Sequence, residues 1–226
     1  MDNLSMEQRL LQLDTCLLSD ALDLLGLDGV AAGLTALSCP TRIAGRVQTV
    51  QLGASGGATS SRHLATAAVA NSRLGDVIAI SAGGFTGTAS WGGLLSAAAV
   101  RQGVAGVIVD GAARDIDEAR CLAFPIYGSA AVCRTARGRL KELDWNEPIR
   151  IAGVLVRPGD FAVADASGVV FIPSELAEQL AITAEALASR EHAILEEIRN
   201  GVPAETAMSV TYEAMLVPQV RGSHRG

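Results

Sequence analysis

Two adjacent residues, Arg114 and Asp115, are the strongest candidates for chemistry in this sequence, and they follow the apolar run Val107–Val109. Open α/β sheets bind ligands beyond the carboxyl ends of their strands, which is where this pair would lie. Arginine offers a planar fork for a carboxylate or phosphate, and aspartate offers the hard oxygen that Mg²⁺ prefers. A purely structural interpretation stays open, in which Asp115 caps a helix over 116–121 and Arg120 pairs with the acidic residues before it.

A glycine-rich segment, residues 83–93, is the second candidate because it leaves an apolar run and enters a helical pattern. Free backbone N–H groups at a helix N-terminus, together with the helix dipole, favour an anion. The segment fits neither the dinucleotide fingerprint nor the phosphate-binding loop of nucleotide-binding enzymes. The alternative is a turn that simply needs glycine.

The third candidate is Glu191, which lies on or beside the apolar seam of a predicted C-terminal helix. That seam consists of Leu180, Leu187, Ile194 and Ile198. A carboxylate at that position is paired with another group, belongs to a site, or lies at the edge of the seam with its side chain exposed to solvent. His63 and His192 have no companions at metal-ligand spacing, so we interpret them as surface or interface residues.

The elements that must position these residues follow an α/β pattern. Buried strands are predicted over 75–81, 103–111 and about 124–127, with a loop over 82–90, a helix over 91–102 and a loop-to-helix segment over 112–123. A strand–helix–strand alternation implies parallel pairing.

The flanking regions are predicted from the same kinds of pattern. Residues 6–25 have helical spacing with a break and a possible cap at Ser19-Asp20, and residues 42–52 alternate like a strand. A loop is predicted over 53–61 and a short helix over 63–72. Antiparallel hairpins are predicted over 149–173, with turns at 152–153, 158–159 and 167–168. A long helix capped by Ser174 and a last helix over about 203–216 complete the chain's predicted elements.

Composition excludes several classes of protein. Of the 226 residues, 49% are hydrophobic and 19% charged, so the chain can bury a core and is not disordered. The net charge of −6 argues against a nucleic-acid partner bound by charge neutralisation. No apolar run approaches the roughly 20 residues of a membrane span, and no secretory signal is visible, so we expect no membrane association and a cytoplasmic protein. The four scattered cysteines are expected to be free, buried thiols.

At these residues the sequence resembles the family of the regulator of ribonuclease activity A and the metal-dependent 4-hydroxy-4-methyl-2-oxoglutarate / 4-carboxy-4-hydroxy-2-oxoadipate aldolases. The matching stretches fall in family order at 19–30, 75–84, 89–119, 124–127 and 153–173, and the run 89–119 is the most specific. The resemblance implies an α/β/β/α swivelling-domain-like sandwich with a mixed central sheet and terminal helices. It also implies a single domain over 1–226 with a helical extension from about 174, assembled as a homotrimer or a dimer of trimers with active sites between subunits.

The resemblance also implies roles for individual residues. Arg114 would bind a 2-oxo acid substrate and stabilise its enolate, and Asp115 would ligate Mg²⁺ or Mn²⁺. Backbone amides near Gly92, Gly93, Leu94 and Leu95 would hold the substrate carboxylate. Glu191 from a neighbouring subunit is the best match to a glutamate that supports the metal through water.

One position departs from the aldolase signature, in which an Asp precedes the Arg-Asp pair by twenty intervening residues, because that position is Gly93 here. The family Asp lies near the metal waters and helps proton transfer. Its loss weakens the case for aldol cleavage, which needs a base, more than the case for oxaloacetate decarboxylation. Ser96, Thr86, Thr88 and Asp110 are possible substitutes.

We therefore expect a divalent-metal-dependent lyase that acts on a 2-oxo acid through an enolate and releases pyruvate. Two alternatives stay open: a non-catalytic regulator that binds a ribonuclease, and another metal-enolate enzyme such as an isomerase or hydratase.

Overall fold

A computed structural model of the chain describes residues 4–56 and 63–208. Its central feature is an eight-stranded mixed sheet in which the path β1-β5-β4-β3-β2-β9-β10 is hydrogen-bonded from neighbour to neighbour, with β6 also paired to β2. The strands of this sheet are β1 (Thr35–Ala36), β2 (Ile43–Ala54), β3 (Val77–Trp91), β4 (Gly106–Ala113), β5 (Ile126–Ala131), β6 (Leu140–Trp145), β9 (Phe161–Asp165) and β10 (Gly168–Ile172). A separate hairpin pairs β7 (Ile149–Ile151) with β8 (Val154–Val156).

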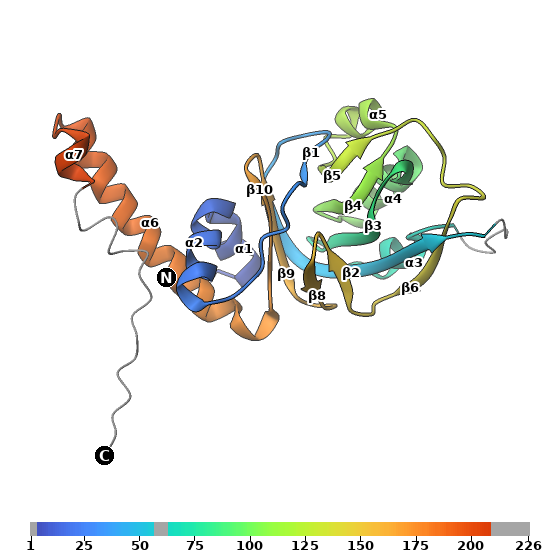
Figure 1. Ribbon diagram of the computed structural model, residues 1–226, viewed down its shortest axis with the longest axis horizontal. Coiled ribbons are helices and arrows are strands. Elements are labelled where there is room, and N and C mark those ends of the chain that lie inside the picture. Colours follow the sequence, from blue (N-terminus) through green and yellow to red (C-terminus); the bar gives the residue numbers. More distant parts are fainter. Residues whose placement is uncertain (1–3, 57–62, 209–226) are drawn as a thin grey trace, which may run out of the picture.

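Helices cover the sheet on two sides (Figure 1). One group is α3 (Thr66–Asn71), α4 (Gly93–Gln102) and α5 (Ile116–Cys121), and the other is α1 (Met6–Gln12), α2 (Thr15–Leu25) and α6 (Ala177–Arg199), which follows a 3₁₀ turn, η1 (Ser174–Leu176). A last short helix, α7 (Ala204–Ala207), follows α6. None of the helices in the described ranges is both long enough and apolar enough to cross a membrane.

Three apolar clusters show that these elements form four layers. The first cluster joins α3, α4 and α5 to one face of β2–β5 through residues such as Ala99 and Ile80. The second joins α1, α2 and α6 to β9 and β10 through residues such as Leu180 and Val163. The third lies between the two β layers and includes Ile108 and Phe171. This arrangement confirms the predicted α/β/β/α sandwich.

Strand β2 belongs to both β layers. Its first residues, Ile43–Arg46, pair antiparallel with β9, and the next, 47–51, pair parallel with β3. Strands β3, β4 and β5 are parallel, as the alternation of strands and helices predicted. The carboxyl ends of β3 and β4 consequently lie side by side, at one edge of the helical layer formed by α4 and α5.

The largest error in the predicted elements concerns residues 82–90, which were expected to form a loop. They continue β3 as an irregular strand, because Phe85, Ala89 and Trp91 pair with the end of β4 after successive shifts of register. Such shifts depend on the partner strand and leave no periodic signal in the sequence. Strands β1 and β6 were not predicted. One of the three predicted hairpin turns is also wrong, because the turn at 158–159 connects β8 to β9, and these two strands do not pair.

Both predicted helix caps were placed wrongly. The N-terminal helices are separated at Leu13-Asp14 rather than at Ser19-Asp20, and the Asp14 carboxylate accepts a 2.8 Å hydrogen bond from the N–H of Leu17. Ser174 starts the 3₁₀ turn and caps no helix with its side chain. The helix expected over 203–216 is described only as α7, and its remainder, like most of the loop 53–61, lies outside the described residues. The cysteines are free as expected but are not buried: Cys39 is half-buried and the others are exposed.

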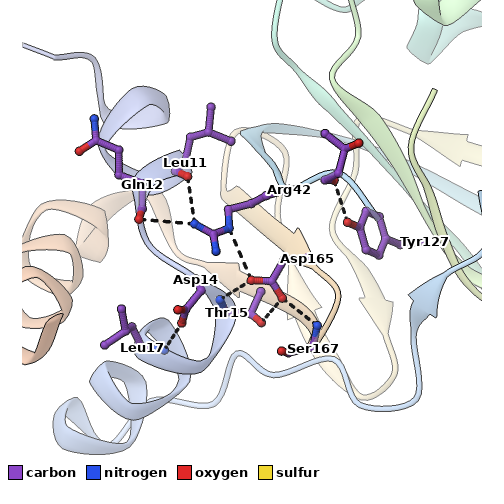
Figure 2. A network of polar contacts seen from close by, with 10 residues as sticks. Leu11, Gln12, Asp14, Thr15, Leu17, Arg42, Tyr127, Asp165 and Ser167 are labelled. Atoms are coloured by element: carbon purple, nitrogen blue, oxygen red, sulfur yellow. Dashed lines mark hydrogen bonds and ion pairs between the residues drawn. The ribbon is translucent and has the colours of Figure 1, made fainter. Parts of the chain in front are cut away.

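A polar network ties the N-terminal helices to the sheet (Figure 2). Asp165, at the end of β9, accepts hydrogen bonds from the N–H and hydroxyl of Thr15, at 2.9 and 2.6 Å, and from the N–H of Ser167 at 2.9 Å. The guanidinium of Arg42 lies 3.6 Å from the same carboxylate. Burial alone would raise the pKa of Asp165, but these hydrogen bonds and the Arg42 charge outweigh burial and hold it below the ordinary value.

We predict that Asp165→Asn destabilises the fold by about 1–3 kcal/mol, because it removes a charged acceptor shared by three donors. Since the folded-state pKa is depressed, the stabilisation from Asp165 is complete above its ordinary pKa of about 3.9 and is lost as pH falls through the lower folded value. Urea unfolding at pH 7 and at pH 3 measures both effects. The control Asp117→Asn, at an exposed carboxylate, should change stability by less than about 0.5 kcal/mol. Equal stability of Asp165→Asn and wild type at pH 7 would contradict the prediction.

Candidate active site

A pocket of about 250 Å³ lies where β3 and β4 end and α4 and α5 begin. This volume is below the range of about 300–1,000 Å³ that is usual for sites of drug-sized ligands, so it suits a small molecule. The pocket is lined by His63, Leu64, Ala89, Ser90, Trp91, Gly92, Gly93, Leu94, Leu95, Arg114, Asp115, Thr135, Ala136 and Arg137. The structure thus brings together the Arg-Asp pair and the start of α4, as the sequence predicted.

Arg114 and Asp115 form an ion pair inside this pocket. The Nε of Arg114 lies 3.0 and 3.1 Å from the two carboxylate oxygens of Asp115. The terminal guanidinium nitrogens of Arg114 form no hydrogen bond within the described ranges, and the side chain is 37% exposed. Arg114 is therefore held through one nitrogen while its remaining donors are available to a ligand.

The backbone of Asp115 directs its carboxylate away from its own helix. Asp115 precedes α5 with φ 57° and ψ 41°, a left-handed conformation that aspartate tolerates better than most residues, and its side chain caps no N–H of α5. Instead, Oδ2 accepts a 2.9 Å hydrogen bond from the N–H of Gly93 at the start of α4. Asp115 thus occupies the N-cap position of α5 but does not cap the helix with its side chain, whereas the expected pair between Arg120 and Asp117 forms at 3.0 Å.

The surroundings of Asp115 keep its carboxylate ionised. Burial alone would raise its pKa, but the hydrogen bond from Gly93 and the hydrogen bond and charge of Arg114 together outweigh burial and lower the pKa below its ordinary value. An ionised carboxylate that is 27% exposed to the pocket is able to bind a cation.

Glycines at the start of α4 make room for this arrangement. A Cβ at Gly92 would lie 2.8 Å from Oδ2 of Asp115 and 3.1 Å from Cγ of Arg114, so a larger residue would displace the pair. The N–H of Gly93 is already used by Asp115. Among the four residues expected to bind a carboxylate through the backbone, Leu94 and Leu95 carry N–H groups that find no acceptor in the described part of the chain. The helix dipole strengthens their attraction for an anion.

Only the end of the glycine-rich segment 83–93 lines the pocket, namely the last residues of β3 from Ala89 and the two glycines that follow. Trp91 fixes that end: its ring stacks on Phe124 with centroids 6.0 Å apart, and its Nε1 donates a 2.9 Å hydrogen bond to Ser96. None of the four residues considered as substitutes for the missing Asp is among the pocket's lining residues. Asp110 in particular accepts a hydrogen bond from the N–H of Ala152.

Glu191 does not reach the pocket of its own chain. It lies on α6, on the opposite side of the sheet from α4 and α5 (Figure 1), and lines a separate apolar groove with residues such as Leu17 and Ile194. Burial raises its pKa, and the charges of Asp14 and Asp20 raise it further. The expectation that Glu191 serves a neighbouring subunit's site stays a prediction.

Sequence reasoning missed three polar lining residues, namely His63, Thr135 and Arg137. His63 was interpreted as a surface or interface residue. The last two belong to the β5–β6 connection, where no strand or helix pattern points to a site. The one signal available was the concentration of arginines in this connection, at positions 134, 137 and 139.

The donor set of the pocket fits a hydrated Mg²⁺ or Mn²⁺. Magnesium commonly keeps several waters and takes one or two carboxylates, so Asp115 alone is a sufficient protein ligand. A site closed by three or more protein ligands does not fit, because the described residues contain no cluster of three His, Cys, Asp or Glu side chains suited to a metal.

The model of a known family, RraA-like (Aldolase/RraA), matches residues 15–171. This match covers well over half of the sequence. The chain belongs to the RraA-like family.

Proteins similar to this chain carry different names. The 4-hydroxy-4-methyl-2-oxoglutarate aldolase of Thermus thermophilus is 33% identical over 133 residues, covering 58% of this chain and 76% of that protein. Protein DlpA of Legionella pneumophila is 28% identical over 200 residues, which cover 88% of this chain but 32% of DlpA. The chain thus spans about a third of the length of DlpA. The uncharacterized protein MJ0644 of Methanocaldococcus jannaschii is 37% identical over 114 residues, which cover 50% of this chain and 54% of MJ0644. The chain therefore spans about half the length of that relative.

Solved structures of RraA-like proteins share the fold. An uncharacterized protein from Pseudomonas syringae superposes with a TM-score of 0.82 at 31% identity, covering 90% of this chain and 96% of that one. RraAS2 of Streptomyces coelicolor, described as an unusual member of the RNase ES inhibitor RraA protein family, has a TM-score of 0.72 at 26% identity, covering 87% and 96%. The proteins similar to this chain thus include a sequence relative named as an aldolase and a structural neighbour from a ribonuclease-inhibitor family, so function must be argued from the site.

We predict that carboxyl NMR titration will give Asp115 a pKa below about 3.9, the ordinary value for aspartate. Arg114→Gln should raise this pKa, since it removes a charged donor from the carboxylate. Arg120→Gln, which removes a guanidinium paired with Asp117 instead, should leave the pKa of Asp115 unchanged. An Asp115 pKa at or above the ordinary value would contradict the stabilisation of its carboxylate by Gly93 and Arg114.

Proposed function

We propose that this RraA-like chain is a divalent-metal-dependent carbon–carbon lyase that acts on a 2-oxo acid through an enolate and releases pyruvate or a homologue. The observation that carries the proposal is the Arg114–Asp115 pair, in which Asp115 is ionised and Arg114 keeps its terminal nitrogens available beside the N-terminus of α4. The aldolase name of the Thermus relative supports the same class of reaction.

Each group has a distinct task in the proposed mechanism. Asp115 would hold Mg²⁺ or Mn²⁺, which when bound supplies electron withdrawal from the 2-oxo group. The N–H groups of Leu94 and Leu95 would bind the substrate carboxylate. The terminal nitrogens of Arg114 would donate hydrogen bonds to the C2 oxygen, where negative charge develops as the bond beta to the ketone breaks. Trp91 and Leu95, both buried, would limit the access of water.

The two candidate reactions, retro-aldol cleavage and oxaloacetate decarboxylation, differ in whether a hydroxyl proton must be removed. Retro-aldol cleavage removes a proton from the 4-hydroxyl group and needs a base, whereas decarboxylation of oxaloacetate does not. Gly93 contributes no carboxylate to the pocket. We therefore propose oxaloacetate decarboxylation as the more efficient activity and retro-aldol cleavage as the slower one, unless Glu191 of a neighbouring subunit supports the metal waters in a homotrimer or dimer of trimers.

The direct test measures pyruvate release from oxaloacetate and from 4-hydroxy-2-oxoglutarate, with Mg²⁺ and with a chelator. Arg114→Ala should lower the metal-dependent rate by at least about 10²-fold, as expected for loss of an oxyanion donor. Arg120→Ala, a matched arginine on α5 that lies outside the pocket, should retain the wild-type rate. Absence of release from both substrates, with no binding of metal, would contradict the lyase proposal and favour a role as a protein-binding regulator.

A second prediction concerns Gly93→Asp, which restores the family carboxylate. A Cβ at this position would lie 3.2 Å from Cβ of Asp115, so a small adjustment accommodates the side chain. The variant should raise retro-aldol cleavage, by up to about 10²-fold if proton transfer limits it, and should change decarboxylation little. Rates are compared at saturating Mg²⁺ after metal binding has been verified by calorimetry. Unchanged aldol activity in a metal-bound variant would refute the proton-transfer argument.

A further inference from the structure

The pocket contains a positive charge that the proposed mechanism does not use. Arg137, in the β5–β6 connection, is one of two arginines that line the pocket. Asp115 is the one acidic side chain among the described lining residues, and it is paired with Arg114. Arg137 is an exposed residue, and its guanidinium forms no ion pair or hydrogen bond within residues 4–56 and 63–208.

The connection that carries Arg137 is held in place by its own hydrogen bonds. Arg139 donates from Nη1 to the carbonyl oxygens of Thr135 and Arg137, both at 3.3 Å. The carbonyl of Arg134 accepts a 3.0 Å hydrogen bond from the N–H of Ala89, itself a lining residue on β3. These contacts fix the backbone on both sides of Arg137 and tie it to the pocket wall.

The arrangement has a consequence for the ligand. A monocarboxylic 2-oxo acid bound as proposed would contact Leu94, Leu95 and Arg114 and would leave the exposed guanidinium of Arg137 without a ligand contact. A second carboxylate at the other end of the ligand would supply it, and a guanidinium binds a carboxylate with two parallel hydrogen bonds. Building on the proposed function, we infer that Arg137 is a specificity-determining residue that binds the distal carboxylate of a dicarboxylic 2-oxo acid.

This role predicts different effects on the two candidate reactions. In 4-hydroxy-2-oxoglutarate the distal carboxylate stays with the departing fragment, so Arg137 contributes to binding of both the substrate and the transition state. In oxaloacetate that carboxylate leaves as CO₂, so an ion pair with Arg137 stabilises the reactant and not the transition state. Arg137→Gln should therefore raise KM for oxaloacetate without lowering kcat, and should lower kcat/KM for 4-hydroxy-2-oxoglutarate.

Binding measurements test the inference separately from turnover. Calorimetry in Mg²⁺ compares 2-oxoglutarate, a dicarboxylate, with 2-oxobutyrate, a monocarboxylate; neither has the 4-hydroxyl or the beta-carboxylate that the proposed cleavage needs. Wild type should bind 2-oxoglutarate at least about tenfold more tightly, the lower limit for one charge-assisted contact. Arg137→Gln should abolish this preference while leaving the affinity for 2-oxobutyrate unchanged, and Arg137→Lys should restore part of it.

The control is Arg134→Gln, an arginine of the same connection that does not line the pocket, and it should keep the wild-type preference. The assignment would be overturned if wild type bound the two acids with equal affinity or bound neither of them. It would also be overturned if Arg137→Gln lowered the affinities for both acids equally. The protein could also prefer 2-oxoglutarate through Arg137 and yet release no pyruvate. That result would support the role of Arg137 and refute the lyase proposal, so failure of the one is distinguishable from failure of the other.

Discussion

The left-handed backbone of Asp115 is the constraint on which the candidate site depends. With φ 57° and ψ 41°, the carboxylate turns from its own helix α5 to the first N–H of α4. A left-handed conformation costs an L-residue roughly 1–2 kcal/mol, and here the hydrogen bond from Gly93 and the ion pair with Arg114 offset that cost. Strain of this kind is concentrated at functional sites because it pre-orients a reactive group.

The pairing of β3 with β4 places the start of α4 next to Arg114 and Asp115. Strands β3 and β4 are parallel neighbours, and the final pairs of their irregular ladder bring Trp91 opposite Ala113. The N–H of Arg114 then donates a 3.0 Å hydrogen bond to the carbonyl of Trp91, immediately before α4 begins. A helix N-terminus that attracts anions and a carboxylate that attracts cations thus become adjacent, which is the charge pattern that a metal-bound 2-oxo acid requires.

The sequence predicted the parts of this arrangement that depend on local pattern. Short apolar runs predicted β3, β4 and β5, and the rule for carboxyl ends of strands predicted the location of Arg114 and Asp115. The extension of β3 to Trp91 was not predictable, because its pairing depends on β4 and not on its own periodicity. Arg137 was missed for a related reason: its position in the pocket depends on hydrogen bonds made by Arg139 and Arg134 within an irregular connection.

The proposed function requires Asp115 to hold a divalent cation next to a bound 2-oxo acid. A crystal structure with Mn²⁺ and oxalate, which resembles the enolate of pyruvate in shape and charge, tests it most directly through the anomalous scattering of manganese. We expect an anomalous peak at the Asp115 carboxylate, with oxalate beside Arg114 and the N–H groups of Leu94 and Leu95. A pocket without manganese, or manganese bound only elsewhere on the chain, would contradict the proposed function.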